Sequence, residues 1–205
     1  MFTGLIRELA TVVSFNDDIL TIASNYTPKI GDSIAINGAC LTVVAFDNDT
    51  FSVQLSPESA TVLAIENYKD TVHIEPAMMM GDRFEGHIVQ GHVDCIGTVT
   101  NIINNGNSTD FFISIQNSFL KYVIPKGSIT IDGVSLTVND ISKDGFRLTI
   151  IPHTIENTLF KSYIINSKVN VETDMFARYI FNMFKKDNDK NNLSWDNVDN
   201  IMARY

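Results

Sequence analysis

The sequence predicts a mainly β protein made of two homologous small barrels in tandem, followed by one C-terminal α-helix. The stretch GDSIAINGACLTV (31–43) returns 95 positions later as KGSITIDGVSLTV (126–138), with seven of 13 aligned residues identical. Each copy alternates apolar and polar residues with period 2, which is typical of half-buried strands. Several short strands within about 90 residues favour a closed barrel, because closure removes exposed sheet edges.

The repeat extends well beyond this motif. Segments 2–12, 51–60 and 71–78 match segments 89–99, 146–155 and 168–175, in the same order and with slowly drifting offsets. This pattern indicates a duplicated domain with small loop insertions, and two copies are too few for a solenoid. We therefore expect an N-terminal domain over residues 1–86 and a C-terminal domain over residues 87–174.

Local chemistry predicts the elements of each copy. Residues 33–36 and 128–131 form strands that turn at Asn37-Gly38 and Asp132-Gly133, which are type I′ hairpin signals, and return along 40–44 and 135–138. Further strands are expected at 98–103, 111–115, 146–151 and 168–172. Short helices are expected at 58–67 and 154–163, each after a proline.

The clearest helix lies after both domains, at residues 175–186. Its apolar residues recur at helical spacing and form one stripe; they are Phe176, Tyr179, Ile180, Met183 and Phe184. The stripe packs either on its own barrel or against another chain. A polar tail follows at 187–205, in which Trp195, Val198 and Met202 could form a weak amphipathic turn.

Composition excludes several functions. The net charge of −9 disfavours sequence-independent binding to nucleic acid or an anionic membrane, since both require a basic surface. No segment has the roughly 20 apolar residues of a membrane span, and the start lacks a signal-peptide pattern. We expect a cytoplasmic protein in which the two cysteines, Cys40 and Cys95, form no disulfide.

Residues 86–95, GHIVQGHVDC, suggest a metal site but do not support one. On an extended strand His87 and His92 would point to opposite faces, and a fourth ligand is missing. We expect no metal, and His87 is interpreted as a capped or turn histidine between the domains. A site role is favoured for His92 because it follows Gly91, which matches Gly4.

The other polar residues of the repeat have two readings each. Cys40 is either a small buried apolar residue or an exposed group at a barrel rim. Thr42 and Thr137 are by default satisfied strand hydroxyls, and Asp174 could simply cap the terminal helix. The chain has no P-loop, GxGxxG, GxSxG or HExxH motif, so the residues alone indicate only two like domains for two like ligands.

Five motifs in this order resemble the riboflavin synthases of the alpha type, a family of lumazine-binding repeats: MFTG, NGACLTV, GHIVQGHVD, KGSITIDGVSLTV and IPHT. The resemblance covers residues 1–185. It implies two six-stranded Greek-key barrels, a homotrimer gathered by the C-terminal helix, and sites between subunits. It implies a dismutation of two 6,7-dimethyl-8-ribityllumazine molecules without a cofactor, and allows an association with lumazine synthase.

The resemblance also implies two pockets. The N-terminal pocket would be lined by Gly4, Leu5, Ile6, Cys40, Leu41, Thr42, Gln54, Leu55, Ser56, Pro57, Glu58 and Ser59. The C-terminal pocket would be lined by Gly91, His92, Val93, Lys126, Ser135, Leu136, Thr137, Ile151, Pro152, His153, Thr154, Ile155 and Glu156.

The same resemblance assigns candidate catalytic roles. Cys40 and Ser33 would activate the nucleophile, His92 would take a proton from the methyl group, and Thr137 and Asp174 would position groups and relay protons. Ser135 stands where the other half has Cys40, which separates a donor half from an acceptor half. The alternatives are a non-catalytic lumazine- or flavin-binding protein of the same fold and a flavin-dependent reductase on a similar barrel.

Overall fold

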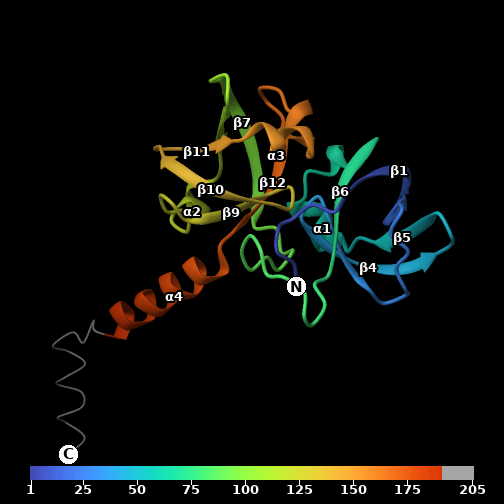
Figure 1. The fold of residues 1–205 in the computed structure, drawn as a ribbon. Coiled ribbons are helices and arrows are strands. Elements are labelled where there is room, and N and C mark those ends of the chain that lie inside the picture. Colours follow the sequence, from blue (N-terminus) through green and yellow to red (C-terminus); the bar gives the residue numbers. More distant parts are fainter. Residues whose placement is uncertain (191–205) are drawn as a thin grey trace, which may run out of the picture.

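The computed structural model describes residues 1–190, and these form two barrels side by side with one helix leading away (Figure 1). The first barrel contains β1 (Glu8–Asn16), β2 (Ile19–Ala23), β3 (Ser33–Ile36), β4 (Ala39–Phe46), β5 (Thr50–Gln54) and β6 (Thr71–Pro76). The second contains β7 (Cys95–Asn104), β8 (Thr109–Ser114), β9 (Ser128–Ile131), β10 (Val134–Ile141), β11 (Gly145–Ile150) and β12 (Lys168–Thr173).

Both barrels are closed, antiparallel and identical in topology. The strand order is β1-β2-β5-β4-β3-β6 in the first and β7-β8-β11-β10-β9-β12, read from β7, in the second. In each barrel three hairpin-connected strands are followed by a strand that returns beside the first of them, which is a Greek key. The expectation of two six-stranded Greek-key barrels is confirmed, and each barrel has its own apolar core.

The two repeated hairpins turn as their sequences predict. Ile36 pairs with Ala39 and Ile131 pairs with Val134, which leaves two residues in each loop. Both loop residues have positive φ, 44° and 80° in the first hairpin and 44° and 85° in the second, as a type I′ turn requires. The hairpin tips meet between the barrels, where a Cβ on Gly38 would lie 2.6 Å from the Gly133 nitrogen.

A buried polar layer joins the barrels beside these tips. His73 on β6 bonds through Nδ1 to the Asp132 carbonyl (2.7 Å), and its Nε2 accepts the Leu159 N–H (2.8 Å). Asn170 on β12, at the matching position, donates to the Asn37 carbonyl (2.8 Å). A side chain on the last strand of each barrel therefore forms a hydrogen bond to a carbonyl group in the hairpin turn of the other barrel.

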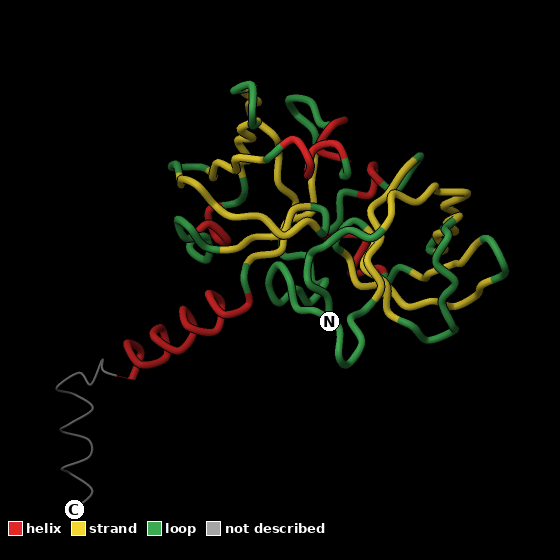
Figure 2. Tube along the Cα trace, viewed as in Figure 1, coloured by secondary structure: helices red, strands yellow, loops and turns green. Residues whose placement is uncertain are grey.

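The helices expected at 58–67 and 154–163 are each broken in two. The structure has α1 (Pro57–Val62) with η1 (Ile65–Asn67), and α3 (Pro152–Glu156) with η2 (Leu159–Ser162). The break follows from contacts between the domains, because the N–H groups of Ala64 and Leu159 are donated to Asn170 and His73. Figure 2 shows these helices as short red segments beside the barrels, and together with the short α2 (Asn117–Leu120) they pack side chains on the barrel cores.

The terminal helix α4 (Met175–Lys190) begins where expected and continues beyond Lys186. Its first turns attach to the second barrel: the Phe181 ring meets Tyr122 edge-on at 5.3 Å between centroids. The helix then projects away from both barrels (Figure 1). The turn suggested by Trp195, Val198 and Met202 lies outside the described residues. No helix within residues 1–190 has the length and apolar character to cross a membrane.

Candidate functional site

The candidate site is built on two equivalent barrel rims, each formed by the return strand of the repeated hairpin. Cys40 follows the first residue of β4, and Ser135 follows the first residue of β10. Both side chains are partly exposed, whereas Leu41 beside Cys40 is buried in the core. The rim position expected for Cys40 is therefore present, and its reading as a fully buried residue is excluded.

Two extended segments run between the rims. The first rim segment (2–6) precedes β1, and the second rim segment (89–93) precedes β7. They pair with each other through two backbone bonds, from Phe2 N–H to Val89 O (2.8 Å) and from Val89 N–H to Phe2 O (3.1 Å). The pairing fixes both segments at the junction of the barrels.

Each rim segment contacts the rim of the opposite barrel, and this corrects the grouping expected from the sequence. Gly91 accepts the Cys40 N–H (2.8 Å), and Gly4 accepts the Ser135 N–H (2.8 Å). Gly91, His92 and Val93 therefore belong to the rim of Cys40, while Gly4, Leu5 and Ile6 belong to the rim of Ser135. The core clusters agree, because Val93 packs on the first core and Ile6 on the second.

The approach of these segments requires glycine. Gly91 has φ +77°, and a Cβ there would lie 2.6 Å from the Cys40 Cβ. Gly4 has φ +80°, and a Cβ there would lie 2.5 Å from the Ser135 Cβ. Positive φ and this closeness both exclude a larger residue without rearrangement.

A cavity of about 280 Å³ opens on the first rim. It is lined by Ala39, Cys40, Ser56, Glu58, Ser59, Val62, Leu63, Gly91, His92 and Val93. Ser56 caps α1 by accepting the Ser59 N–H (3.0 Å), and Pro57 occupies the first turn of that helix. The cavity therefore joins the start of a helix, a thiol and the exposed His92 side chain.

Eight of the twelve residues expected for this pocket lie outside its lining: Gly4, Leu5 and Ile6, which belong to the other rim, Pro57 of α1, and Leu41, Thr42, Gln54 and Leu55. Leu41 and Leu55 are buried in the first core. Thr42 is exposed on β4 and pairs with Ser33 of β3. Gln54 donates to Asp18 (2.6 Å) at the end of β5.

On the second rim Ser135 forms a hydrogen bond that the sequence did not predict. Its Oγ lies 2.7 Å from His87 Nδ1, and His87 Nε2 lies 3.2 Å from Thr130 Oγ. Burial lowers the pKa of His87, and the negative charge of Asp174 opposes that shift. A neutral imidazole can accept the hydroxyl proton, so Ser135 and His87 form a candidate acid–base pair.

The remaining residues of the second rim are placed as follows. Asp174 accepts the Phe176 N–H (2.7 Å) and so caps α4, while remaining close enough to influence His87. Thr137 is exposed on β10 opposite Ser128. Lys126 is exposed and has φ +63°. The stretch Ile151–Glu156 forms α3 and its cap position, and Ile151 offers no side-chain cap where the first half has Ser56.

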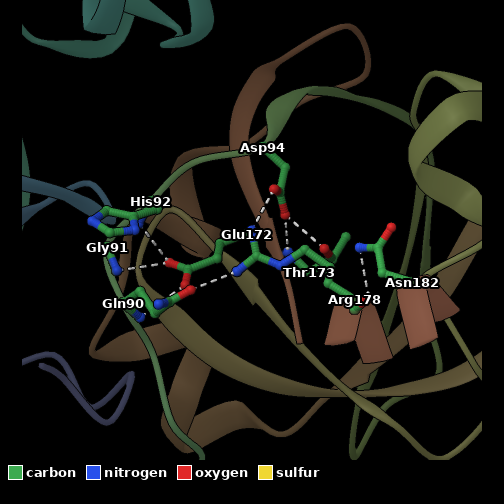
Figure 3. Close-up of polar contacts among 8 residues, drawn as sticks. All are labelled: Gln90, Gly91, His92, Asp94, Glu172, Thr173, Arg178 and Asn182. Carbon is green, nitrogen blue, oxygen red and sulfur yellow. Dashed lines mark hydrogen bonds and ion pairs between the residues drawn. The ribbon is translucent and has the colours of Figure 1, made fainter. Parts of the chain in front are cut away.

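Two equivalent buried carboxylates hold the rim segments. Glu75 accepts the N–H groups of Thr3 (2.7 Å) and Gly4 (3.0 Å). Glu172 accepts those of Gln90 (2.8 Å), Gly91 (2.9 Å) and His92 (3.1 Å), as Figure 3 shows.

Burial raises the pKa of both carboxyls, that of Glu172 to about 7, and the N–H bonds oppose the shift. The position of His92 thus depends on a carboxylate 80 residues away in sequence.

The two cysteines differ in character. Cys95 is buried at the start of β7, and burial with the nearby Asp94 charge raises its thiol pKa to about 12. Cys40 is partly exposed in the cavity, and both thiols are free. Cys40 is therefore the accessible sulfur of this pair.

Comparisons with known proteins find one family over most of the chain. A family model described as the lumazine binding domain matches residues 3–77 and 90–174. A riboflavin synthase of Photobacterium phosphoreum is 42% identical over 193 residues, which cover 88% of this chain and 87% of the relative. The riboflavin synthase of Bacillus subtilis is 38% identical over 198 residues, 92% of each chain. That of Saccharomyces cerevisiae is 36% identical over 201 residues, 88% of this chain and 84% of the relative.

Solved structures share the architecture. The crystal structure of LumP with riboflavin superimposes with a TM-score of 0.75 at 22% identity and covers 85% of this chain and all of LumP. LumP with 6,7-dimethyl-8-(1'-D-ribityl) lumazine gives a TM-score of 0.71 at 23% identity, over 85% of this chain and 99% of LumP. This similarity establishes the shared fold.

Proposed function

The chain belongs to the lumazine-binding domain family, and on this premise we propose that it is a riboflavin synthase. It converts two molecules of 6,7-dimethyl-8-ribityllumazine to riboflavin and 5-amino-6-ribitylamino-uracil, the last step of riboflavin biosynthesis. The observation that carries the proposal is 34–42% identity to riboflavin synthases over most of the chain, on a fold with two equivalent rims.

The duplicated fold suits a dismutation, because donor and acceptor are the same molecule. One lumazine loses a proton from its 7-methyl group to give a ring-stabilised carbanion, and a four-carbon unit passes to the other. The two products together contain all the atoms of the two lumazine molecules, so the reaction needs no external oxidant. Orientation of two rings face to face is the main contribution asked of the protein, worth at best about 7–11 kcal/mol.

The side chains divide into two groups by barrel. Cys40 and His92 border the same cavity, so both would act on one bound ring. With Cys40 on the nucleophile that adds to the acceptor, that ring is the acceptor, and the methyl proton of the donor would be taken at the other rim. Ser135 with His87 would act on the other ring, and a hydroxyl paired with a neutral imidazole suits proton transfer. Such acid–base help is worth roughly 10²–10⁴-fold in rate.

The two groups are best combined between subunits of a homotrimer. The apolar side chains Phe176, Tyr179, Ile180, Met183 and Phe184 of α4 are 53–68% exposed in the single chain. A contiguous exposed apolar face of this kind is typical of an interaction surface. We assign it to trimer contacts that bring the first rim of one chain to the second rim of its neighbour.

The alternative is a protein of this fold that binds lumazine or flavin without turnover. The comparison with LumP, at 22–23% identity, establishes the fold and carries no function. The 42% identity to a riboflavin synthase, with Cys40, His92, Ser135 and Asp174 all present, favours the enzyme. A flavin reductase would require a nicotinamide, and turnover of lumazine alone would separate it from the synthase.

The test is to mix the purified protein with 6,7-dimethyl-8-ribityllumazine alone and to follow the products by chromatography. We expect riboflavin and the pyrimidine in equal amounts. A Cys40→Ser variant should be folded and slower, by about tenfold or more if the thiol takes part in the chemistry. Lumazine that binds without product would establish the non-catalytic alternative and leave Cys40 as a wall of the pocket.

A further inference from the structure

We propose that Arg178 of α4 is a positioning residue that ties the second rim segment to α4 and thereby sets His92 against Cys40. The terminal helix would then have a second task besides chain association, namely to fix the geometry of a pocket on the other barrel. The kinetic part of this inference rests on the proposed function, whereas the structural part does not.

Arg178 binds Gln90 near the start of the second rim segment and Asp94, the residue that directly follows it. Its Nη1 donates to Asp94 Oδ1 (2.7 Å) and its Nη2 donates to Gln90 Oε1 (2.8 Å), as Figure 3 shows. Gln90 and Asp94 flank Gly91, His92 and Val93, which line the cavity. The planar guanidinium has two donors in fixed relation, so it holds these two residues at one separation.

The residues that Arg178 binds are themselves anchored. The other oxygen of Asp94 accepts the Thr173 N–H (2.7 Å) and the Thr173 hydroxyl (2.6 Å). The Asp94 side chain is 10% exposed and that of Arg178 is 21% exposed, so water screens this pair only weakly. Together with Glu172 on the segment's backbone, these contacts leave the segment little freedom.

Within residues 1–190, no arginine side chain bonds to the first rim segment, although the charge of Arg7 acts on Glu75. The repeat that aligns 71–78 with 168–175 puts Gly81 at the position of Arg178, and Gly81 is exposed. Glu75 bonds to the first rim segment much as Glu172 bonds to the second. The extra contact therefore exists only on the segment that carries His92 and covers Cys40.

The contact path from α4 to Cys40 is short. Arg178 holds Gln90 and Asp94, Glu172 holds the N–H groups between them, and Gly91 accepts the Cys40 N–H. Loss of the guanidinium would free Gln90 and Asp94 from α4 while Glu172 still holds the middle of the segment. We expect a looser rim and not an unfolded barrel.

The rate at which iodoacetamide modifies the Cys40 thiol measures this position directly. Mass spectrometry would follow Cys40 and Cys95 separately in wild-type protein, Arg178→Met and Gln90→Met. Each test variant removes one or both of the hydrogen bonds between Arg178 and the residues Gln90 and Asp94. The three hydrogen bonds from the backbone N–H groups of residues 90–92 to Glu172 remain. Arg147→Met is the matched control, since Arg147 pairs with Asp110 and Asp140 on the same barrel but contacts neither rim segment.

We expect Cys40 to react at least about threefold faster in both test variants, at unchanged rates for buried Cys95 and for the Arg147→Met control. Arg178→Lys should give an intermediate rate, because an ammonium group is a point charge without the fixed fork. Should Arg178→Met fail to fold, Gln90→Met and Arg178→Lys carry the test. An unchanged Cys40 rate in folded test variants would overturn the proposal.

The kinetic readout separates positioning from general stability. With lumazine as substrate, kcat should fall by about tenfold or more in Arg178→Met, while sedimentation shows the same assembly as the wild type. An equal loss in Arg147→Met would point to a structural effect only and would overturn the kinetic part. A wild type that does not turn over lumazine would refute the proposed function, yet the thiol rates would still report on the segment.

Discussion

At the scale of single residues, His73 and Asn170 show how two different side chains perform one task. Each lies on the last strand of its barrel, bonds to a hairpin carbonyl of the other barrel, and accepts an N–H from the other barrel. Because Leu159 N–H donates to Nε2, the proton of neutral His73 must lie on Nδ1, facing the Asp132 carbonyl. Burial lowers the pKa of His73 to about 4, so this neutral form persists in the fold.

His73→Asn is therefore expected to be tolerated, since asparagine offers the same donor and acceptor at the matching position. Its free energy of unfolding at pH 7 should fall by less than about 1.5 kcal/mol. His73→Leu leaves the Leu159 N–H and the Asp132 carbonyl without partners and should cost about 2–5 kcal/mol. Urea denaturation of both variants measures the difference, and equal losses would show that the hydrogen bonds contribute nothing.

The pH dependence of stability follows from the same residue. Because the folded pKa of His73 is lower than its unfolded value of about 6.5, its contribution is present above pH 6.5 and is lost as the pH falls toward 4. The advantage of wild type over His73→Asn should therefore shrink and then reverse, with a total change of up to about 3 kcal/mol across that range. Taking the difference between the two proteins cancels the opposite trend of Glu172, whose pKa is raised. A constant difference would contradict a neutral buried His73.

At the scale of elements, the local signals in the sequence were sufficient for the hairpins and insufficient for the helices. Asn37-Gly38 and Asp132-Gly133 determine their turns by backbone preference alone, so these two turns and the strands that flank them were predicted correctly. The helices at 58–67 and 154–163 were predicted as continuous because their breaks depend on bonds to the opposite barrel. The helix propensity of a segment carries no information about hydrogen-bond partners on another domain.

The rim segments illustrate a second limit of sequence reasoning. The internal match between Gly4 and Gly91 correctly identified equivalent positions. It could not reveal that each segment crosses to the other barrel, because a repeat relates positions within a unit and not their partners. The same reason hides the contact of His87 with Ser135, which joins residues 48 positions apart. The sequence analysis singled out His87, but it did not indicate Ser135 as its hydrogen-bond partner.

Gly91→Ala tests the importance of this crossing. The new methyl group would meet the Cys40 Cβ at 2.6 Å with φ at +77°, so the segment must move. We expect a loss of roughly 2–4 kcal/mol in the free energy of unfolding, together with loss of turnover. Gly31→Ala is the control, because Gly31 also has positive φ (+90°) but no atom within 4 Å of the new methyl group.

The free energy of unfolding of the Gly31→Ala control should fall only by the backbone penalty of about 1 kcal/mol, and its activity should be retained. Chemical denaturation and lumazine turnover measure both effects. Equal stability losses in the two variants would mean that the contact with Cys40 can relax without cost.

At the scale of the whole molecule, the two barrels share a topology but differ at positions on the rims and on α4. In the alignment of the two repeats, Cys40 corresponds to Ser135, Ser56 corresponds to Ile151, and Gly81 corresponds to Arg178. Topology is maintained by core packing and by the hairpin turns, which both halves retain. The differences lie on the rims and on α4, where they leave the two cores unchanged. Such a molecule can hold two like rings and treat them differently.

If the working site joins the first rim of one chain to the second rim of its neighbour, two inactive variants should restore each other. Ser59→Trp would fill the cavity of the first rim, and Thr137→Trp would obstruct the second rim. Each homotrimer should be inactive. In a mixed trimer, about one site in three combines two intact rims, provided that the chains associate head to tail around a threefold axis.

Co-expression of the two variants with different tags, followed by purification on both tags, would isolate mixed trimers. We expect them to show about a third of the wild-type turnover rate per trimer. A mixture of separately purified homotrimers that do not exchange chains should stay inactive and serves as the control. Mixed trimers without activity would mean that both rims of one chain serve the same site, and the exposed face of α4 would then have to explain assembly without explaining catalysis.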